Sequence, residues 1–249
     1  SNIMADEPLT LEPDEKAQTA AQAFERYDLV SAPVVDKDRR LVGRVTVNAV
    51  VDYIRESTET EQLSRAGLRE GEDIFASVWD SVKNRWSWLA INMVTAFIAS
   101  RVIGAFEGSI EKLVALAALM PIVAGIGGNS GNQTITMIVR ALALGQVQQE
   151  SARVLLRKEI GVAMVNGLIW GSLLGFVAWW LYRSVALGAV MTAAMMLNLI
   201  VAATVGVAVP LLRQRLGYDP AIGSSVLITA VTDSGGFFIF LGLATLFLL

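Results

Sequence analysis

The chain has 249 residues, 54% of them hydrophobic, and its mean hydropathy of +0.53 is high for a soluble domain. Long uncharged runs indicate a protein that crosses a membrane several times. The sequence has no cysteine and no histidine, which excludes disulfides and sites of thiolate or imidazole ligands. Any bound metal ion must therefore take oxygen ligands, as Mg²⁺, Ca²⁺ and Mn²⁺ do.

Charge divides the chain into an acidic head and a mildly basic body. Residues 1–85 carry 11 Lys and Arg against 17 Asp and Glu, whereas the remaining residues carry 9 against 6. We expect a soluble head followed by a membrane body. Residues 1–3, which precede Met4, are predicted to be the remnant of a cloning tag.

The head is predicted to contain a small α/β unit over residues 9–57, followed by a charged helical connector. Apolar residues at helical spacing, short β-branched runs and a polar turn over residues 36–40 carry this prediction. The expected elements are a helix at Glu15–Tyr27, strands at Pro33–Val35 and Leu41–Val47, a helix at Val47–Arg55 and the connector at Glu56–Asp80.

Five apolar segments follow, each long enough at ~1.5 Å per residue to cross ~30 Å of hydrocarbon. They are Trp86–Phe106, Leu113–Leu144, Ile160–Tyr182, Ala189–Leu212 and Ala221–Leu249. Eight Lys and Arg residues flank one side of these spans and three flank the other. This bias predicts a cytoplasmic N-terminus and, because the number of spans is odd, a C-terminus on the outside.

Asp233 is the single charged residue of the last span. A carboxylate at the centre of a membrane helix costs roughly 2.5–3.5 kcal/mol, which usually accompanies a binding or transport function. One carboxylate is too little to strip water from Mg²⁺, so we predict that a hydrated ion is held by one Asp233 from each subunit of a two-fold dimer. The alternative is a structural carboxylate, bonded to a neighbouring helix or kept protonated.

The second span contains the run GIGGNSGNQT, residues 125–134. So many glycines predict an irregular backbone whose free carbonyls, with the amide oxygens, suit a hard cation or its water shell. Glycine alone would favour close helix packing, but Asn129, Asn132 and Gln133 favour an ion path because packing needs no polar cluster.

Other polar and small residues of the spans are predicted to serve packing. Asn92, Asn166 and Asn198 are expected to form hydrogen bonds between helices, and Gly167, Gly171 and Gly175 to permit close helix contact. Each carboxylate of the connector, taken singly, is expected to lie on a solvated helix face. As a set they form a candidate ion sensor, since a divalent cation would relieve their repulsion; they are Asp52, Glu56, Glu59, Glu61, Glu70, Glu72, Asp73 and Asp80.

Three segments carry a family resemblance: PIVAGIGGNSGNQTITMIVRAL (residues 121–142), RLGYDPAIGSSVLITAVTDSGG (215–236) and APVVDKDRRLVGRVTV upstream. Together they resemble the MgtE-type magnesium channels, which are related to the animal SLC41 transporters, and the last segment resembles a C-terminal CBS module. The resemblance implies an all-α membrane protein that is a homodimer with five transmembrane helices per subunit. It further implies a pore on the dimer axis and Mg²⁺ influx across the bacterial inner membrane.

The resemblance also implies roles for particular residues. Asp233 matches the pore aspartate, Gly128 and Thr229 would supply backbone carbonyls, and Asn132 would line the path. The remaining implied residues are Asn129, Gln133 and Ser225 as pore lining and Asp52 and Glu61 as regulatory metal ligands. By the same resemblance, residues 4–57 form a partial CBS region, 58–82 a connecting "plug" helix and 83–249 the pore domain.

The chain departs from the family pattern in three places. Only one CBS module is present, the usual TVDD is replaced by Thr46-Val47-Asn48-Ala49, and Val226 follows Ser225 where a proline is common. The first two departures concern the regulatory region. The third predicts a less kinked entry into the last span.

The predicted function is a passive Mg²⁺-selective channel in the lipid bilayer, gated by cytosolic Mg²⁺. One alternative is a proton- or sodium-coupled exporter of divalent cations, in which Asp233 titrates. Another is a membrane sensor whose CBS region binds an adenine nucleotide. A membrane enzyme is the least favoured class, because acid–base residues are scarce, and no nucleic-acid partner is expected.

Overall fold

The computed structural model describes residues 9–65, 67–68, 75–143, 146–147, 151–221 and 223–249. The chain forms two compact units, Ser1–Leu63 and Ser64–Leu249, and each is described by itself. The predicted tag remnant at residues 1–3 lies outside the described residues.

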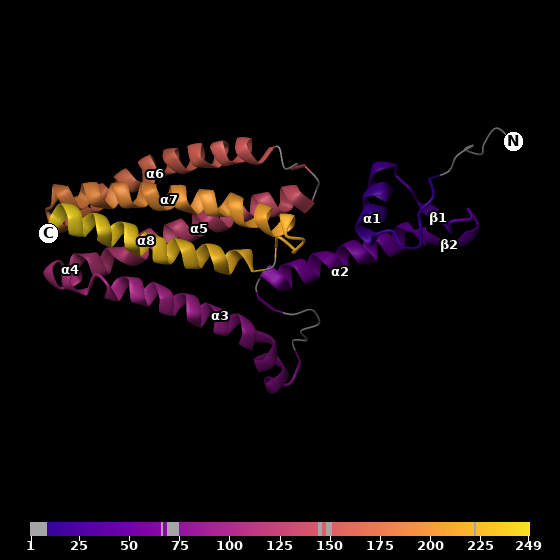
Figure 1. Cartoon of the computed structure of the whole chain (residues 1–249), viewed down its shortest axis with the longest axis horizontal. Helices are drawn as coiled ribbons and strands as arrows, with labels where there is room; N and C mark the ends of the chain where they lie inside the picture. Colours follow the sequence, from indigo (N-terminus) through magenta and orange to yellow (C-terminus); the bar gives the residue numbers. More distant parts are fainter. Residues whose placement is uncertain (1–8, 66, 69–74, 144–145, 148–150, 222) are drawn as a thin grey trace. The chain divides into compact units, whose positions relative to one another are not determined.

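The first unit is a small α/β layer (Figure 1). Helix α1 (Ala17–Arg26) and the start of α2 (Val47–Arg65) accompany an antiparallel hairpin of β1 (Ser31–Val35) and β2 (Leu41–Thr46). Asp36 closes the hairpin turn, because its Oδ1 accepts hydrogen bonds from the backbone N–H groups of residues 38 and 40 at 2.9 and 2.8 Å. The predicted α/β unit is thus confirmed, and α1, β1 and β2 lie within two residues of their expected bounds.

A small apolar core holds this unit together. Its buried side chains come from both helices, from β1 and from the segment before α1, and they are Leu11, Ala21, Phe24, Ala32 and Val50. Helix α2 runs on to Arg65 instead of ending at the predicted residue 55. Residues 58–65 therefore belong to α2 and 78–82 to the next helix, while Glu70, Glu72 and Asp73 of the predicted connector lie outside the described residues. The predicted domain boundaries stay a prediction.

The second unit is a helical bundle (Figure 1). Its described helices are α3 (Val78–Gly104), α4 (Glu107–Lys112), α5 (Ala115–Ala143), α6 (Ala152–Tyr182), α7 (Val185–Arg215) and α8 (Ser224–Leu248). Within the described residues, four of these helices are long and apolar enough to cross a membrane: α3, α6, α7 and α8. Helix α5 has 29 residues, but its glycines and amides lower its hydropathy, so five spans remain a prediction.

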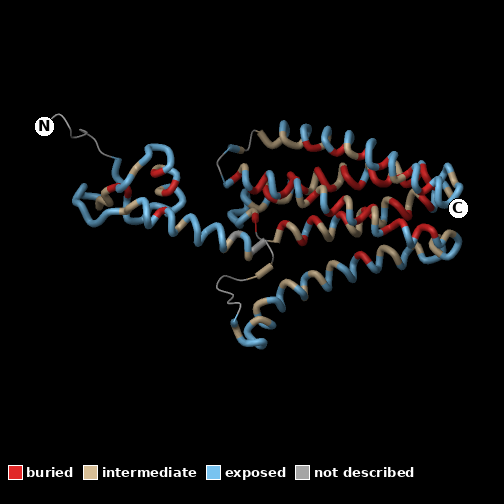
Figure 2. The backbone as a smooth tube through the Cα atoms, turned by 180° about the vertical axis from the view of Figure 1, so that it is seen from behind, coloured by how far each residue is buried: buried red, intermediate tan, exposed pale blue. Residues whose placement is uncertain are grey.

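Helix α7 is the centre of the bundle, packed against α5, α6 and α8. Buried residues concentrate on α5, α7 and α8, whereas α3 is exposed along most of its length (Figure 2). The fully buried side chains include Met191, Met195 and Phe240. Helix α3 contacts the bundle through α8, so most of its apolar surface is left for lipid or another chain.

The ends of the long helices are defined by local chemistry. Arg183 adopts a left-handed conformation (φ +54°) that ends α6, and Ser184 then caps α7, its Oγ accepting from the backbone N–H of Leu187 at 3.2 Å. Before α8, the Oδ1 of Asp219 accepts from the N–H of Ala221 at 2.8 Å, and Gly223 takes a positive φ of +71°. These turns set the antiparallel order of α6, α7 and α8.

Candidate functional site

Helix α5 is continuous through its glycine-rich run, so the prediction of an irregular backbone is wrong. The physical reason is close packing. A Cβ on Gly127 would collide with Asn198 of α7, and a Cβ on Gly131 with Ile228 of α8. The glycines admit neighbouring helices to the α5 backbone, while its carbonyls keep their helical hydrogen bonds.

The opposite side of α5 carries an exposed polar stripe. Gly125, Asn129, Gln133 and Thr136 are all exposed, and their spacing of four, four and three residues places them on one face of a helix. Half-buried Asn132 lies within the same stripe. Amide side chains in contact with hydrocarbon would lose their hydrogen bonds, so this face is suited to water or to a polar partner surface.

Helix α8 contributes a second polar stripe beside the first. Ser225, Thr229 and Asp233 follow one another at four-residue spacing, and all three are half-buried. The Oγ of Ser225 donates to Oδ1 of Asn132 at 3.0 Å, which joins the stripe of α8 to that of α5. We call the combined set the α5–α8 polar surface; its members are Gly125, Asn129, Asn132, Gln133, Thr136, Ser225, Thr229 and Asp233.

Two predicted backbone ligands flank this surface. Gly128 is buried where α5 meets α8, and a Cβ there would lie 3.5 Å from the Oγ1 of Thr232, an ordinary contact distance. The carbonyl of Thr229 accepts from the Thr232 hydroxyl at 3.3 Å in addition to its place in the helix. A carbonyl has two lone pairs, and the second one at Thr229 is occupied by the Thr232 hydroxyl.

Asp233 is the one carboxylate of the α5–α8 polar surface. Within the described residues no three acidic side chains gather into a group able to hold a metal ion. A single copy of the surface can thus present one negative charge and several neutral oxygen atoms. Such a set fits an ion that keeps its water shell better than one stripped of water.

Asn198 lies at the junction of α5, α7 and α8. Its Nδ2 donates to the carbonyl of Val123 in α5 at 2.9 Å, which confirms the predicted bond between helices. The side chain fills the space left open by Gly127 and Gly236. Asn92, in contrast, donates to the carbonyl of Trp88 in its own helix at 3.0 Å, so the prediction of an interhelical bond is wrong there.

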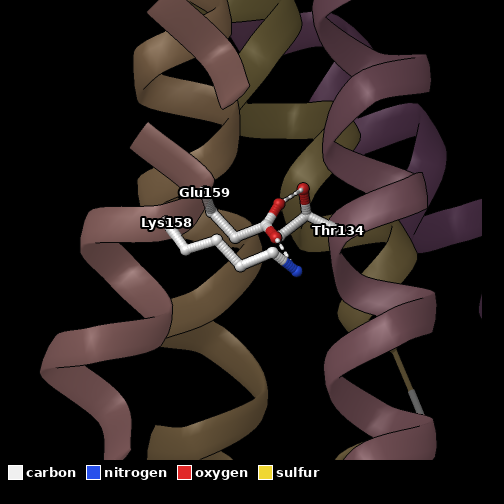
Figure 3. Close-up of polar contacts among 3 residues, drawn as sticks. All are labelled: Thr134, Lys158 and Glu159. Atoms are coloured by element: carbon white, nitrogen blue, oxygen red, sulfur yellow. Dashed lines mark hydrogen bonds and ion pairs between the residues drawn. The ribbon is translucent and has the colours of Figure 1, made fainter. Parts of the chain in front are cut away.

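Glu159 of α6 is a buried carboxylate that sequence reasoning missed. It is 7% exposed, its Oε2 accepts from the hydroxyl of Thr134 at 3.1 Å, and its Oε1 lies 3.5 Å from Nζ of Lys158 (Figure 3). Glu159 begins the buried row of α6 that continues at Ala163 and Gly167. The four-residue spacing of Glu159, Ala163 and Gly167 could have indicated that Glu159 faces the bundle. Lys158 and Glu159 instead resemble the charged residues that commonly flank a membrane span.

Thr134 lies on the side of α5 opposite to the polar stripe, since it follows Asn132 by two residues. Its methyl and Cβ pack where Gly206 of α7 has no side chain. The segment of α5 around residue 133 is therefore held from one side by Ser225 and from the other by Glu159.

Comparison with known proteins gives the family. Residues 120–243 match the MgtE model, described as a divalent cation transporter, and residues 1–56 match the CBS domain. The chain belongs to the MgtE family. The CBS match lies at the N-terminal end of this chain, so the prediction of a C-terminal module is wrong in that respect.

Three curated relatives of this MgtE-family chain are each named magnesium transporter MgtE. The protein of Thermus thermophilus is 34% identical over 100% of this chain and 55% of its own length. Those of Bacillus subtilis and Enterococcus faecalis are 31% and 25% identical over 93% and 100% of this chain, and 51% and 54% of their own lengths. The chain thus spans about half the length of the curated relatives it matches.

The two predicted regulatory residues lie on α2 of the CBS-like unit. Asp52 is exposed, and for Glu61 the side chain lies outside the described part. Positions 52 and 61 are nine residues apart, which at about 100° per residue places them on opposite sides of the helix. One ion could not be held by both positions of a single α2, so each would need other partners.

Proposed function

We propose that this MgtE-family chain forms a Mg²⁺-selective channel that admits Mg²⁺ across the bacterial inner membrane. In this proposal two copies form a homodimer, α5 is the fifth membrane-spanning helix, and the pore follows the two-fold axis. The N-terminus is cytoplasmic and the C-terminus lies outside.

The α5–α8 polar surface is the observation that carries the proposal. It joins exposed amides, hydroxyls and Asp233 on helices that are otherwise apolar. Contact with lipid would leave these groups without hydrogen-bond partners. A second copy related by a two-fold axis would enclose water between two such surfaces and bring two Asp233 carboxylates toward each other. A divalent ion would relieve their repulsion.

Mg²⁺ gives up its water reluctantly, so the ion is proposed to pass with its water shell. Asp233 attracts it, while the carbonyls of Gly128 and Thr229 contact its water molecules. Further along, Asn132, Asn129, Gln133 and Ser225 accept or donate hydrogen bonds to the same shell. The membrane potential supplies the force, about 2.3 kcal/mol per charge per 100 mV and about twice that for a divalent ion.

Gating is proposed to use the CBS-like unit and the connecting segment. Cytosolic Mg²⁺ would be the regulatory ion, bound with the help of Asp52 and Glu61, which are placed on opposite sides of α2 and would thus meet different partner carboxylates. An adenine nucleotide is a candidate second ligand of the CBS-like unit.

Mg²⁺ uptake into liposomes containing the purified chain tests the proposal. Asp233→Ala and Asp233→Asn should both abolish most of the uptake, because each removes the charge. Asp219→Asn is the matched control: this exposed carboxylate precedes α8, and an amide keeps the oxygen that accepts from Ala221. Uptake by the Asp233 variants at the native rate would refute the proposal. Uptake that stops when a proton or sodium gradient is removed at fixed voltage would indicate a coupled transporter instead.

A further inference from the structure

A groove lies between the beginning of α6 and the end of α7, away from the α5–α8 polar surface. Its volume is about 400 Å³, within the range of ~300–1,000 Å³ usual for small-molecule sites. The wall is apolar and includes Leu156, Val207 and Leu211, which pack against the buried cluster around Ile138. The apolar wall of the groove is therefore continuous with the core of the bundle.

Two arginines are part of the lining, one from each helix. Arg153 is in the first turn of α6 and Arg215 is the last residue of α7, and both are exposed. No carboxylate of the described residues pairs with either guanidinium. Two positive groups that pair with no carboxylate among the described residues thus border an apolar groove at one end of membrane-spanning helices.

The deeper part of the groove offers little to a polar ligand. The hydroxyl of Thr204 already donates to the carbonyl of Ile200 at 2.8 Å, and the other lining residues beyond the two arginines are aliphatic. Positive charge at the rim and hydrocarbon inside match an amphiphilic anion. A soluble anion would leave the apolar wall uncovered.

We propose that this groove binds an anionic phospholipid. Its phosphate lies between Arg153 and Arg215, and one acyl chain lies along the wall of Leu156, Val207 and Leu211. Guanidinium groups suit phosphate because they donate two parallel hydrogen bonds, and basic pockets between membrane helices commonly hold acidic headgroups. The site shares no residue with the α5–α8 polar surface, so its failure and that of the proposed channel are distinguishable.

The test measures binding of palmitoyl-oleoyl phosphatidylglycerol to the purified chain in detergent, by native mass spectrometry. Phosphatidylcholine with the same acyl chains and free glycerol phosphate are the comparison ligands. The native chain should bind the anionic lipid at least about tenfold more tightly than either. Arg153→Gln with Arg215→Gln should remove most of this preference, since two charge-assisted contacts are lost.

Two further variants keep the result interpretable. Arg101→Gln with Arg140→Gln makes the same charge change at exposed positions outside the groove, and it should bind like the native chain. Ala208→Trp fills the groove and should weaken lipid binding with both arginines intact. Equal binding of the two lipids, tight binding of glycerol phosphate, or unchanged binding in the Arg153 and Arg215 double variant would each overturn the proposal. So would a loss of dimer in Ala208→Trp with lipid binding intact, because the groove would then be a protein interface.

Discussion

Helices α5 and α6 both use glycine to approach a neighbour, yet their free faces are opposite in character. On α6 the buried row of Gly167, Gly171 and Gly175 packs on α7, and beyond the charged first turns most exposed side chains are large and apolar. On α5 the buried glycines pack on α7 and α8, and the exposed stripe consists of amides, a hydroxyl and glycine.

The difference separates packing from function. A glycine on a membrane helix allows another helix to approach closely, because the Cβ of a larger residue at that position would collide with it. The chemistry of the opposite face decides whether the helix meets lipid or water. The free face of α6 thus suits contact with lipid, and that of α5 suits contact with water or a polar partner surface.

Gly175→Ala should have the largest effect on stability. Its Cβ would lie 2.5 Å from the carbonyl oxygen of Gly188, a backbone atom of α7 that cannot turn away. Overpacking of this kind lowers the free energy of unfolding by ~1–3 kcal/mol. Gly161→Ala on the same helix has open space and should gain up to ~1 kcal/mol from helix propensity. Unfolding of the purified proteins by denaturant in detergent measures both, and equal stabilities would contradict the close contact.

Glu159→Ala should have the next largest effect, because the buried hydroxyl of Thr134 loses its acceptor, at a cost of ~1–3 kcal/mol. Glu159→Gln keeps an acceptor oxygen for Thr134 but loses the ion pair to Lys158. Because the Lys158 side chain is 57% exposed, this ion pair is screened by solvent and contributes at most ~1 kcal/mol. The same unfolding assay should rank the glutamine variant above the alanine variant. Equal losses of stability in the two variants, both of which lack the charge, would show that the charge of Glu159, rather than its hydrogen bond, holds α5.

Asn129→Leu should have the smallest effect on stability, because the side chain is exposed on the free face of α5. If the proposed pore is correct, Mg²⁺ uptake into liposomes should still fall about tenfold, since ~1.4 kcal/mol of hydrogen bonding to the hydrated ion is lost. Leu168→Ala, an exposed position on α6, should leave uptake unchanged. Equal uptake in the two variants would remove the functional distinction between the faces.

Much of the fold follows from periodicity. Apolar spacing and turn residues predict the hairpin, the long helices and their order, but not the short helix α4, and the similarity to MgtE relatives covers the same segments. The continuous helical backbone of α5 was not predicted. Helix propensity describes an isolated helix and does not include the neighbouring helices that pack against the glycines. Glu159 was missed for a related reason, since its partner Thr134 is 25 residues away in the chain.

The sequence by itself determined that metal binding here must use oxygen, that the body is apolar, and that Asp233 is the one charge of the last span. These are statements about composition, which folding does not alter. Only the tertiary structure decided which faces of α5 and α8 stay open, that Ser225 joins Asn132, and that Arg153 and Arg215 border one groove. The rotation of one helix against another depends on which side chains fit at their contact, and that fit involves residues far apart in the chain.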